Sequence, residues 1–336
     1  MVAPNQNVVS LEPMKTRKLG WTDLELTTIG LGTWAMGGGD WTYSWGPQDD
    51  QASIEAIHKA LDLGINWIDT APAYGLGHAE EVVGRALHGR HPRPLIATKC
   101  GLVWNDQKRI SGKLTRDSIQ AEIEASLRRL RVETIDLYQI HWPTTAAEVE
   151  EGWSAIAAGV AGGKIRYAGV SNFSVAQIER VHAIHPVASL QPPYSLLARD
   201  VEEDLLPCCA ARRIGVVAYS PMQKGLLTGK ITPARVAALP PDDHRRQDPQ
   251  FQEPRLSANL EFAQGLQRLA QPRGHTVAQA AIAWVLRRPE VTSAIVGARR
   301  PAQIEEIVGA ADWNLAPEDL SGIDELLNKR RARTVS

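Results

Sequence analysis

Short apolar runs alternate with longer amphipathic segments along almost the whole chain. Eight runs have the length and composition of buried strands: 27–31, 65–68, 95–98, 135–140, 167–170, 188–190, 215–218 and 293–296. Between and after them, apolar residues recur at helical spacing, as where Ile54, Ile57, His58 and Leu61 share one face. Similar helical patterns cover 51–63, 79–87, 118–130, 149–161, 175–184, 204–212, 277–287 and a segment from 301. Strands that alternate with helices predict a parallel α/β fold.

Two parallel architectures compete for this pattern. The segment from Gly30 to Ala35 matches G-x-G-x-x-A, a fingerprint of doubly wound dinucleotide-binding sheets. That fingerprint requires a helix to open at the glycines, but four further glycines and Pro47 follow within a dozen residues. Eight βα units without a linker instead favour one (β/α)₈ TIM barrel. We predict an N-terminal tail over 1–14, flexible in solution, and a single domain over 15–330.

Three additions to the barrel are expected. A turn at 19–24 lies between two strand-like pieces and indicates an N-terminal β-hairpin. A long segment, 221–259, follows the seventh strand and is rich in Pro, Asp, Arg and Gln. Loops of that length in compact domains are usually functional or mobile. A final helix is expected near 317–330.

Composition narrows the class of protein. The 336 residues contain 37 basic and 38 acidic residues, a net charge of −1, which argues against a dedicated nucleic-acid binder. No run approaches the roughly 18 apolar residues of a membrane helix. Three cysteines without a CxxC motif predict a reduced, cytoplasmic chain. The sequence leaves the oligomeric state open. Ten tryptophans against three phenylalanines make tryptophan unusually frequent.

Ionisable residues follow three neighbouring strands. Asp69, Lys99 and His141 stand at strand ends, and Tyr74 lies on the loop after Asp69. Taken singly, each has an ordinary structural explanation, but barrels collect their chemistry at the C-terminal ends of strands. A lysine ammonium lowers the pKa of a neighbouring tyrosine, and an aspartate holds the ammonium in place. The set therefore predicts a proton donor for carbonyl reduction, with His141 orienting the carbonyl. No cluster has metal-ligand spacing, so we expect no metal.

Several longer motifs occur in a fixed order. They are the segments 30–34, 68–75, 97–99, 135–143, 165–173 and 218–221, which include Asp69-Thr70-Ala71-Pro72-Ala73-Tyr74-Gly75 and Gln139-Ile140-His141-Trp142-Pro143. In these motifs the chain resembles the aldo-keto reductase family from about 15 to 327. The resemblance implies a catalytic tetrad of Asp69, Tyr74, Lys99 and His141, with Tyr74 as general acid. It also implies a nicotinamide cofactor as hydride donor.

The resemblance further implies a cofactor site. Ser171, Asn172 and Gln191 would bind the carboxamide, Tyr219 would stack on the ring, and the start of the 221–259 segment would line the pyrophosphate. The full expected set is Gly32, Thr33, Trp34, Asp69, Ser171, Asn172, Gln191, Tyr219, Ser220, Pro221, Met222, Lys224, Gly225, Leu226, Gly297, Ala298, Arg299, Gln303 and Glu306.

The end of the eighth strand indicates which nicotinamide cofactor binds. Arg299 and Arg300 precede Pro301, which suits the first turn of a helix. A helix N-terminus beside guanidinium groups favours an anion such as the adenosine 2′-phosphate. We therefore expect NADPH/NADP⁺ rather than NADH/NAD⁺. Ile307, where many family members carry Asn, is a departure that affects the hydrogen bonding of the adenine.

The substrate is expected to be a small-molecule aldehyde or ketone. Trp34, Tyr74, Trp104, His141 and Trp142 would form its pocket, with the other aromatics of the first loop nearby. Two alternatives stay open. One is an NADP(H)-binding sensor or assembly subunit of reductase fold with low turnover, similar to the potassium-channel β subunits. The other is a Schiff-base aldolase that uses Lys99, which would require an unpaired, desolvated lysine.

Overall fold

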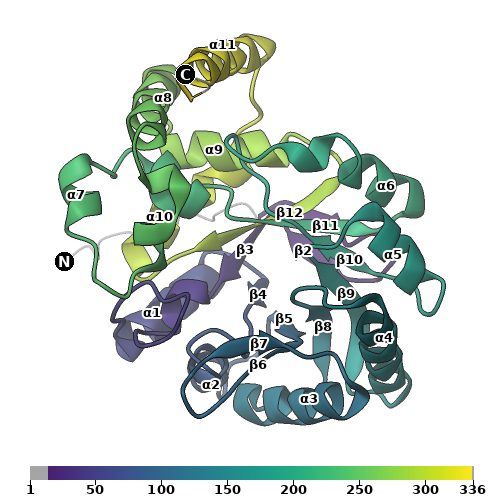
Figure 1. Cartoon of the computed structure of the whole chain (residues 1–336). Helices are drawn as coiled ribbons and strands as arrows, with labels where there is room; N and C mark the ends of the chain where they lie inside the picture. Colours follow the sequence, from purple (N-terminus) through teal and green to yellow (C-terminus); the bar gives the residue numbers. More distant parts are fainter. Residues whose placement is uncertain (1–13, 335–336) are drawn as a thin grey trace, which may run out of the picture.

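Eight parallel strands form a closed barrel in the computed structural model, which describes residues 14–334 (Figure 1). In the order in which they pair, the strands are β3 (Ile29–Gly32), β4 (Trp67–Asp69), β5 (Leu95–Cys100), β8 (Ile135–Ile140), β9 (Ile165–Ser171), β10 (Ser189–Gln191), β11 (Gly215–Tyr219) and β12 (Val291–Gly297). β12 pairs with β3 and closes the ring. The predicted (β/α)₈ TIM barrel is confirmed. Of the predicted tail, only Met14 lies within the described residues.

Helices surround the barrel, as Figure 1 shows. They are α1 (Asp50–Asp62), α2 (His78–Ala86), α3 (Arg116–Leu130), α4 (Ala146–Ala161), α5 (Val175–His182), α6 (Leu205–Arg212), α7 (Pro233–Ala237), α8 (Arg255–Ala270), α9 (Val277–Leu286), α10 (Pro301–Val308) and α11 (Pro317–Thr334). Polar caps fix several starts; Ser174 with Gln177 and Thr276 with Gln279 form capping boxes. None of the described helices is long and apolar enough to cross a membrane.

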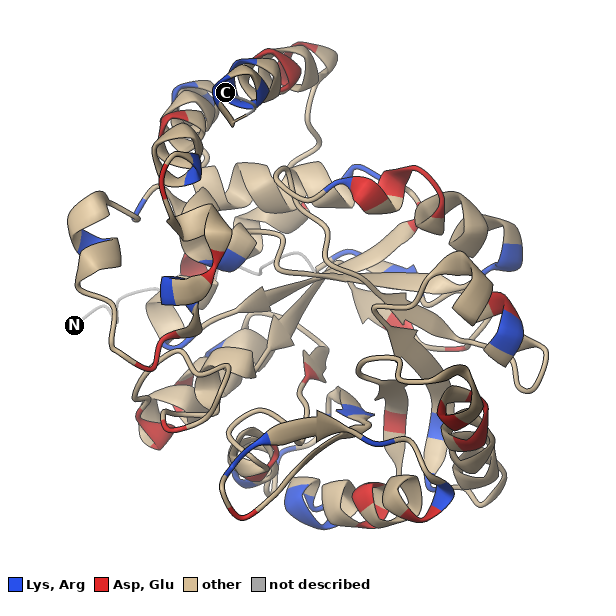
Figure 2. Ribbon diagram, viewed as in Figure 1, with Lys and Arg blue, Asp and Glu red and all other residues tan. Residues whose placement is uncertain are grey.

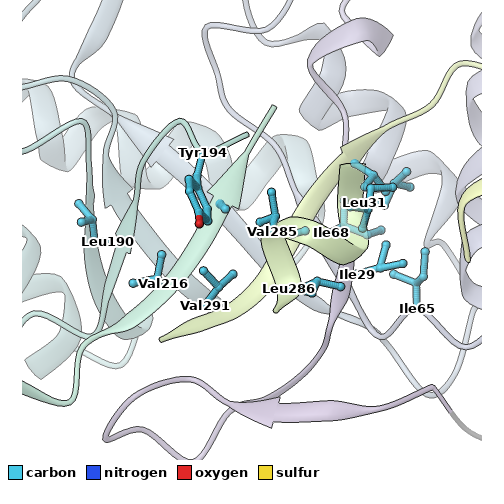
Figure 3. Packing of buried hydrophobic residues seen from close by; sticks show 14 of the residues in the cluster. Ile29, Leu31, Ile65, Ile68, Leu190, Tyr194, Val216, Val285, Leu286 and Val291 are labelled. Atoms are coloured by element: carbon cyan, nitrogen blue, oxygen red, sulfur yellow. The ribbon is translucent and has the colours of Figure 1, made fainter. Parts of the chain in front are cut away.

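The core lies between the strands and the helices. Outward-facing residues such as Ile29, Leu31 and Ile68 pack in one cluster with helix residues such as Val285 and Leu286 of α9 (Figure 3). All five side chains are buried. Charged residues lie mainly on the helices and turns around this core (Figure 2). Burial on one helix face and charge on the other is the pattern that the helical spacing predicts.

The N-terminal hairpin is confirmed as β1 (Thr16–Lys18) paired antiparallel with β2 (Glu25–Thr27). Its turn packs closely against the chain before β11: a Cβ on Gly20 would lie 2.3 Å from the Arg213 carbonyl oxygen, and Gly20 has φ +55°. Leu19 and Leu24 are buried in a cluster with Trp67 and Val217 from inside the barrel. The hairpin therefore adds to the packing of the barrel interior.

Three features differ from the expectations, of which one is α8, a helix that was not predicted. A second hairpin, β6 (Leu102–Trp104) with β7 (Ile110–Gly112), follows β5 and was not predicted. The strand expected over 65–68 is β4, which starts at Trp67 rather than at Ile65. The Ile65 amide instead donates to the Ala60 carbonyl near the end of α1.

The final helix agrees with the sequence, whereas the long segment after β11 ends earlier than the expected residue 259, because α8 begins at Arg255. The segment contains short helical turns, η3 (Gln223–Thr228), α7, η4 (His244–Gln247) and η5 (Pro249–Phe251), before α8 begins at Arg255. We refer to residues 221–254 as the lid. The predicted C-terminal helix is present as α11, which packs beside α8 (Figure 1).

Candidate active site

A cavity of about 1060 Å³ opens at the C-terminal ends of the barrel strands. Its floor includes Gly32, Asp69, Ser171, Gln191 and Tyr219, each from the last residues of a different strand. The first βα loop and the lid form its sides. This is the place where the fold collects side chains from many strands, as expected for a barrel of this type.

Three of the predicted catalytic side chains touch one another beneath this cavity. The Lys99 ammonium donates to Asp69 Oδ1 at 2.7 Å, to the Thr70 carbonyl at 2.9 Å and to Tyr74 Oη at 3.2 Å. Lys99 has no exposed surface and Asp69 has 2%. The three N–H groups of the ammonium thus each have an acceptor. These three bonds hold the Lys99 ammonium in one position, in contact with the phenol oxygen of Tyr74.

Tyr74 is held by a close approach of two loops. The next residue, Gly75, has φ +64°, and a Cβ there would lie 2.0 Å from the Gly37 carbonyl oxygen. The contact brings the turn after β4 against the first βα loop. Trp34 stacks on Tyr74 at 6.2 Å between ring centroids, with 19° between the planes. The phenol oxygen therefore lies at the cavity with its ring packed on one side.

His141 completes the predicted set. Its ring lies edge-on to Tyr74, with ring centroids 5.7 Å apart. Its backbone is fixed on both sides, because its amide donates to the Cys100 carbonyl and its carbonyl accepts from Asn172 Nδ2. Both Tyr74 and His141 line the cavity. The structure thus brings together the three residues that the sequence placed at strand ends and Tyr74 from the loop after Asp69.

The electrostatics correct one expectation. Burial raises the pKa of Tyr74 well above its ordinary value, and the charge of Asp69 raises it further. The pKa of Tyr74 is therefore raised overall, and the expected net lowering by Lys99 is wrong. Burial also lowers the pKa of Lys99, against the opposing effects of Asp69 and Glu80. Burial and the charge of Lys99 hold the pKa of His141 well below its usual range. At neutral pH the site thus holds a protonated phenol beside an uncharged imidazole.

The residues expected at the carboxamide lie together at the cavity. Ser171 Oγ donates to the Gln191 carbonyl at 2.8 Å, and the Tyr219 hydroxyl donates to Asn172 Oδ1 at 3.0 Å. Asn172 has φ +62°, a left-handed conformation that turns the chain sharply after β9. One contact was not foreseen: Gln191 Nε2 donates to Asp69 Oδ2 at 2.8 Å. That the four expected residues of this group bind the nicotinamide of a cofactor stays a prediction.

The phosphate-binding residues that were expected flank the other end of the cavity. Arg299 donates from Nε to Gln48 Oε1 at 2.5 Å, from Nη1 to the Trp45 carbonyl at 3.3 Å, and from Nη2 to the Pro47 carbonyl. Gln303 accepts from the amides of Arg299 and Arg300. Arg299 and Gln303 line the cavity, as do the other expected residues in this list: Ser220, Pro221, Met222, Lys224, Gly225, Gly297, Ala298 and Glu306.

Three expected residues do not line the cavity. Thr33 is fully buried and donates its hydroxyl to the Asp69 carbonyl. Leu226 is buried within the lid, where it packs with Phe251 and Ile231. Trp104 lies in the unpredicted hairpin β6–β7, which contributes Leu102, Ile110, Ser111 and Gly112 to the cavity in its place.

Tryptophans dominate the substrate side of the cavity. Trp34, Trp41, Trp45 and Trp142 line it, and Trp142 is 48% exposed. The lid adds residues that the sequence did not single out: His244 stacks on Trp34 at 4.7 Å, and Arg245 lies 4.6 Å over the Trp45 ring. These two lid residues belong to no recognisable sequence motif, so their place in the cavity wall is seen only in the folded structure. Within residues 14–334 no group of His, Cys, Asp and Glu could hold a metal ion.

The closed parallel barrel and its cavity at the strand ends define an enzyme of the (β/α)₈ class. The chain belongs to the aldo/keto reductase family, whose sequence profile matches residues 28–328. It is therefore an oxidoreductase that reduces carbonyl groups, from a family that uses a nicotinamide cofactor.

Similar proteins agree with this membership. The chain is 40% identical to the aldo-keto reductase YhdN of Bacillus subtilis over 94% of each chain. It is 35% identical to the NADH-specific methylglyoxal reductase of Escherichia coli, over 93% of this chain and 98% of that one. Among solved structures, the glycerol dehydrogenase AKR11B4 of Gluconobacter oxydans superposes with a TM-score of 0.85 at 41% identity, covering 94% and 95% of the two chains.

Proposed function

We propose that this protein is an NADPH-dependent reductase of small aldehydes and ketones, with Tyr74 as the general acid. The observation that carries the proposal is the Lys99 ammonium, which contacts both Asp69 Oδ1 and Tyr74 Oη. A bound reduced nicotinamide supplies the hydride. The residues described below bind the substrate carbonyl and provide the proton.

His141 and Tyr74 bind the substrate carbonyl oxygen. The lowered pKa of His141 keeps its imidazole neutral, so one ring nitrogen donates a hydrogen bond without adding a charge. Tyr74 donates from Oη, and its raised pKa keeps the proton on the phenol until negative charge develops on the carbonyl oxygen. Lys99, 3.2 Å away, then stabilises the phenolate that remains. Asp69 opposes the lowering of the Lys99 pKa by burial, and its carboxylate holds the ammonium in place.

The residues present fit a nicotinamide dinucleotide. The cavity runs from the tetrad to the N-terminus of α10, and polar groups of Ser171, Asn172 and Gln191 lie at one end. At the other end, all three acceptors of the Arg299 guanidinium are uncharged. A half-buried positive charge without an ion pair to a carboxylate among the described residues favours an anionic ligand group.

The preference for NADPH rests on this guanidinium. Three of its five N–H groups are bonded to the first βα loop, which leaves two for a ligand and fixes the direction in which they point. A preorganised guanidinium suits the 2′-phosphate that distinguishes NADPH from NADH. One relative is NADH-specific, so cofactor choice varies among similar chains. The cytoplasmic location stays a prediction from cysteine usage.

The experiment is a substrate panel with both cofactors. Purified protein is mixed with NADPH or NADH and with aromatic aldehydes, short-chain aldehydes, diketones or sugars, and the absorbance of the reduced nicotinamide is followed. We expect turnover of at least one carbonyl class, with a higher kcat/KM for NADPH. Binding of NADPH without turnover across the panel would instead favour a sensor or assembly subunit.

A further inference from the structure

Both carboxylate oxygens of Asp69 are bonded to side chains from other strands. Oδ1 accepts from Lys99 of β5 at 2.7 Å, and Oδ2 accepts from Gln191 Nε2 of β10 at 2.8 Å. Asp69 and Gln191 are each 2% exposed. The second contact joins residues 122 positions apart in the sequence. Asp69 is thus held between the lysine and an amide, and only one of the two belongs to the tetrad.

The amide of Gln191 has one allowed orientation. With its nitrogen toward Asp69, the two N–H groups reach Asp69 Oδ2 and, at 3.4 Å, Gln139 Oε1. The reversed amide would place an oxygen 2.8 Å from a buried carboxylate and remove the donor to Asp69 Oδ2, which is costly. Within residues 14–334 no hydrogen bond to Gln191 Oε1 is present, and Gln191 lines the cavity. The amide oxygen is therefore the group left for a ligand.

The backbone and the neighbouring strand keep Gln191 in this position. Its carbonyl accepts from Ser171 Oγ at 2.8 Å and from the Asn172 amide at 3.2 Å. Between β8 and β10, Gly169 has no side chain, and a Cβ there would lie 2.2 Å from Ser189 Oγ and 3.1 Å from Gln139 Cγ. The glycine thus leaves the space through which Gln139 reaches Gln191.

We propose that Gln191 is a positioning residue of the proton-donating machinery: its amide nitrogen orients Asp69, and through Asp69 the ammonium of Lys99, while its amide oxygen remains for the cofactor. The inference rests on the proposed function for its catalytic consequence. The same side chain then contacts the group that delivers the hydride and the group that fixes the proton donor. Binding of the cofactor at the amide oxygen is thereby coupled to the orientation of Asp69 at the amide nitrogen.

The variant Gln191→Glu separates the two faces of the side chain. It keeps an acceptor oxygen for a ligand but replaces the N–H donor with a second carboxylate oxygen, 2.8 Å from Asp69 Oδ2. Two carboxylates at that distance cannot both ionise, so one keeps its proton to a much higher pH. The pair is stable while it shares a proton, and its stability is lost as the pH rises above the ordinary carboxyl value.

The first measurement is the unfolding midpoint in urea of the ligand-free protein between about pH 5 and pH 8. We expect Gln191→Glu to match the wild type near the acid end and to fall progressively below it as the pH rises. The double variant Asp69→Asn with Gln191→Glu exchanges donor and acceptor, so it should lose this pH step. A parallel curve for Gln191→Glu and the wild type would overturn the contact. The double variant also keeps the test open if the single variant unfolds at the alkaline end.

The second measurement is kcat against pH with saturating cofactor and carbonyl. Gln191→Glu should lose about tenfold or more between pH 6 and pH 8 relative to the wild type, because the second charge displaces Lys99 and Asp69. Gln267→Glu on α8 is the matched control, since it makes the same change at an exposed residue that does not line the cavity; it should leave the pH profile of kcat unchanged. A stability step with an unchanged kcat profile would overturn the positioning role.

The two measurements also separate this inference from the proposed function. The urea experiment contains neither cofactor nor substrate, so its result does not depend on any turnover. Absence of wild-type turnover with every carbonyl would refute the reductase proposal, whereas absence of the pH step would refute the contact between Gln191 and Asp69.

Discussion

Replacing Arg299 with alanine tests the cofactor assignment at one side chain. The guanidinium has two N–H groups free for a ligand after its three bonds to Gln48, the Trp45 carbonyl and the Pro47 carbonyl. A charge-assisted hydrogen bond contributes about 1.5–3 kcal/mol. Because the two bonds share one partly exposed charge, we expect a joint loss of about 2–3 kcal/mol, or about 30- to 150-fold in affinity for the 2′-phosphate.

The assay is the ratio of kcat/KM for NADPH to that for NADH. The ratio is the right quantity because Arg299→Ala also removes the contacts to the first βα loop, which affects both cofactors. The ratio should fall by the same 30- to 150-fold, mainly through KM. Arg300→Ala is the matched control, because this exposed neighbour makes the same charge change without lining the cavity. Its ratio should change by less than about threefold.

Two results would refute the reasoning. One is an unchanged ratio in Arg299→Ala, which would mean that this guanidinium does not read the phosphate. The other is an equal fall in Arg300→Ala, which would indicate that a general positive field, rather than a directed pair of N–H groups, favours NADPH.

Three further predictions concern stability and chemistry. Burial raises the pKa of Glu122 to about 7, so its ionisation destabilises the fold increasingly from about pH 4.5 to pH 7. The variant Glu122→Gln can still accept from the Gly101 amide. In urea titrations its unfolding free energy should exceed that of the wild type by up to about 3 kcal/mol above pH 7 and by little near pH 4. Gly75→Ala should lower the unfolding free energy by about 1–3 kcal/mol and reduce kcat, because its φ of +64° and the Gly37 carbonyl at 2.0 Å leave no place for a methyl group. Borohydride added with a carbonyl substrate should leave no adduct on Lys99 in a peptide mass map, because its amine is buried and bonded to Asp69, the Thr70 carbonyl and Tyr74; an adduct there would favour the aldolase.

The barrel could be predicted from the sequence because its strands are apolar on both faces and its helices on one. The run at 135–140 coincides with β8, since Ile135, Leu137, Tyr138 and Ile140 are apolar and polar residues stand on both sides of the run. The hairpin β6–β7 was not predicted, because the five residues between Trp104 and Ile110 contain no glycine or proline to mark a tight turn. Trp104 was therefore expected to line the cavity only because it follows β5 in the sequence, whereas it lies in β6 and does not line the cavity.

The site was predictable where chemistry follows strand ends, and not where it depends on packing. Asp69, Lys99 and His141 stand at strand ends, so their convergence follows from the barrel. The raised pKa of Tyr74 depends on burial, which no spacing in the sequence reports. The contact from Gln191 to Asp69 joins two strands that do not pair with each other, so it appears only in the closed barrel.

The central claim is that Tyr74 donates the proton, and Tyr74→Phe tests it most directly. The substitution removes one hydroxyl group and keeps the ring that packs on Trp34. Wild type and variant are compared for the dissociation constant of NADPH, by quenching of tryptophan fluorescence, and for single-turnover reduction of the best carbonyl of the panel. The account predicts nearly unchanged NADPH binding and a loss of at least about 100-fold in the rate of reduction. Retained reduction per bound cofactor, with any change confined to binding, would contradict it.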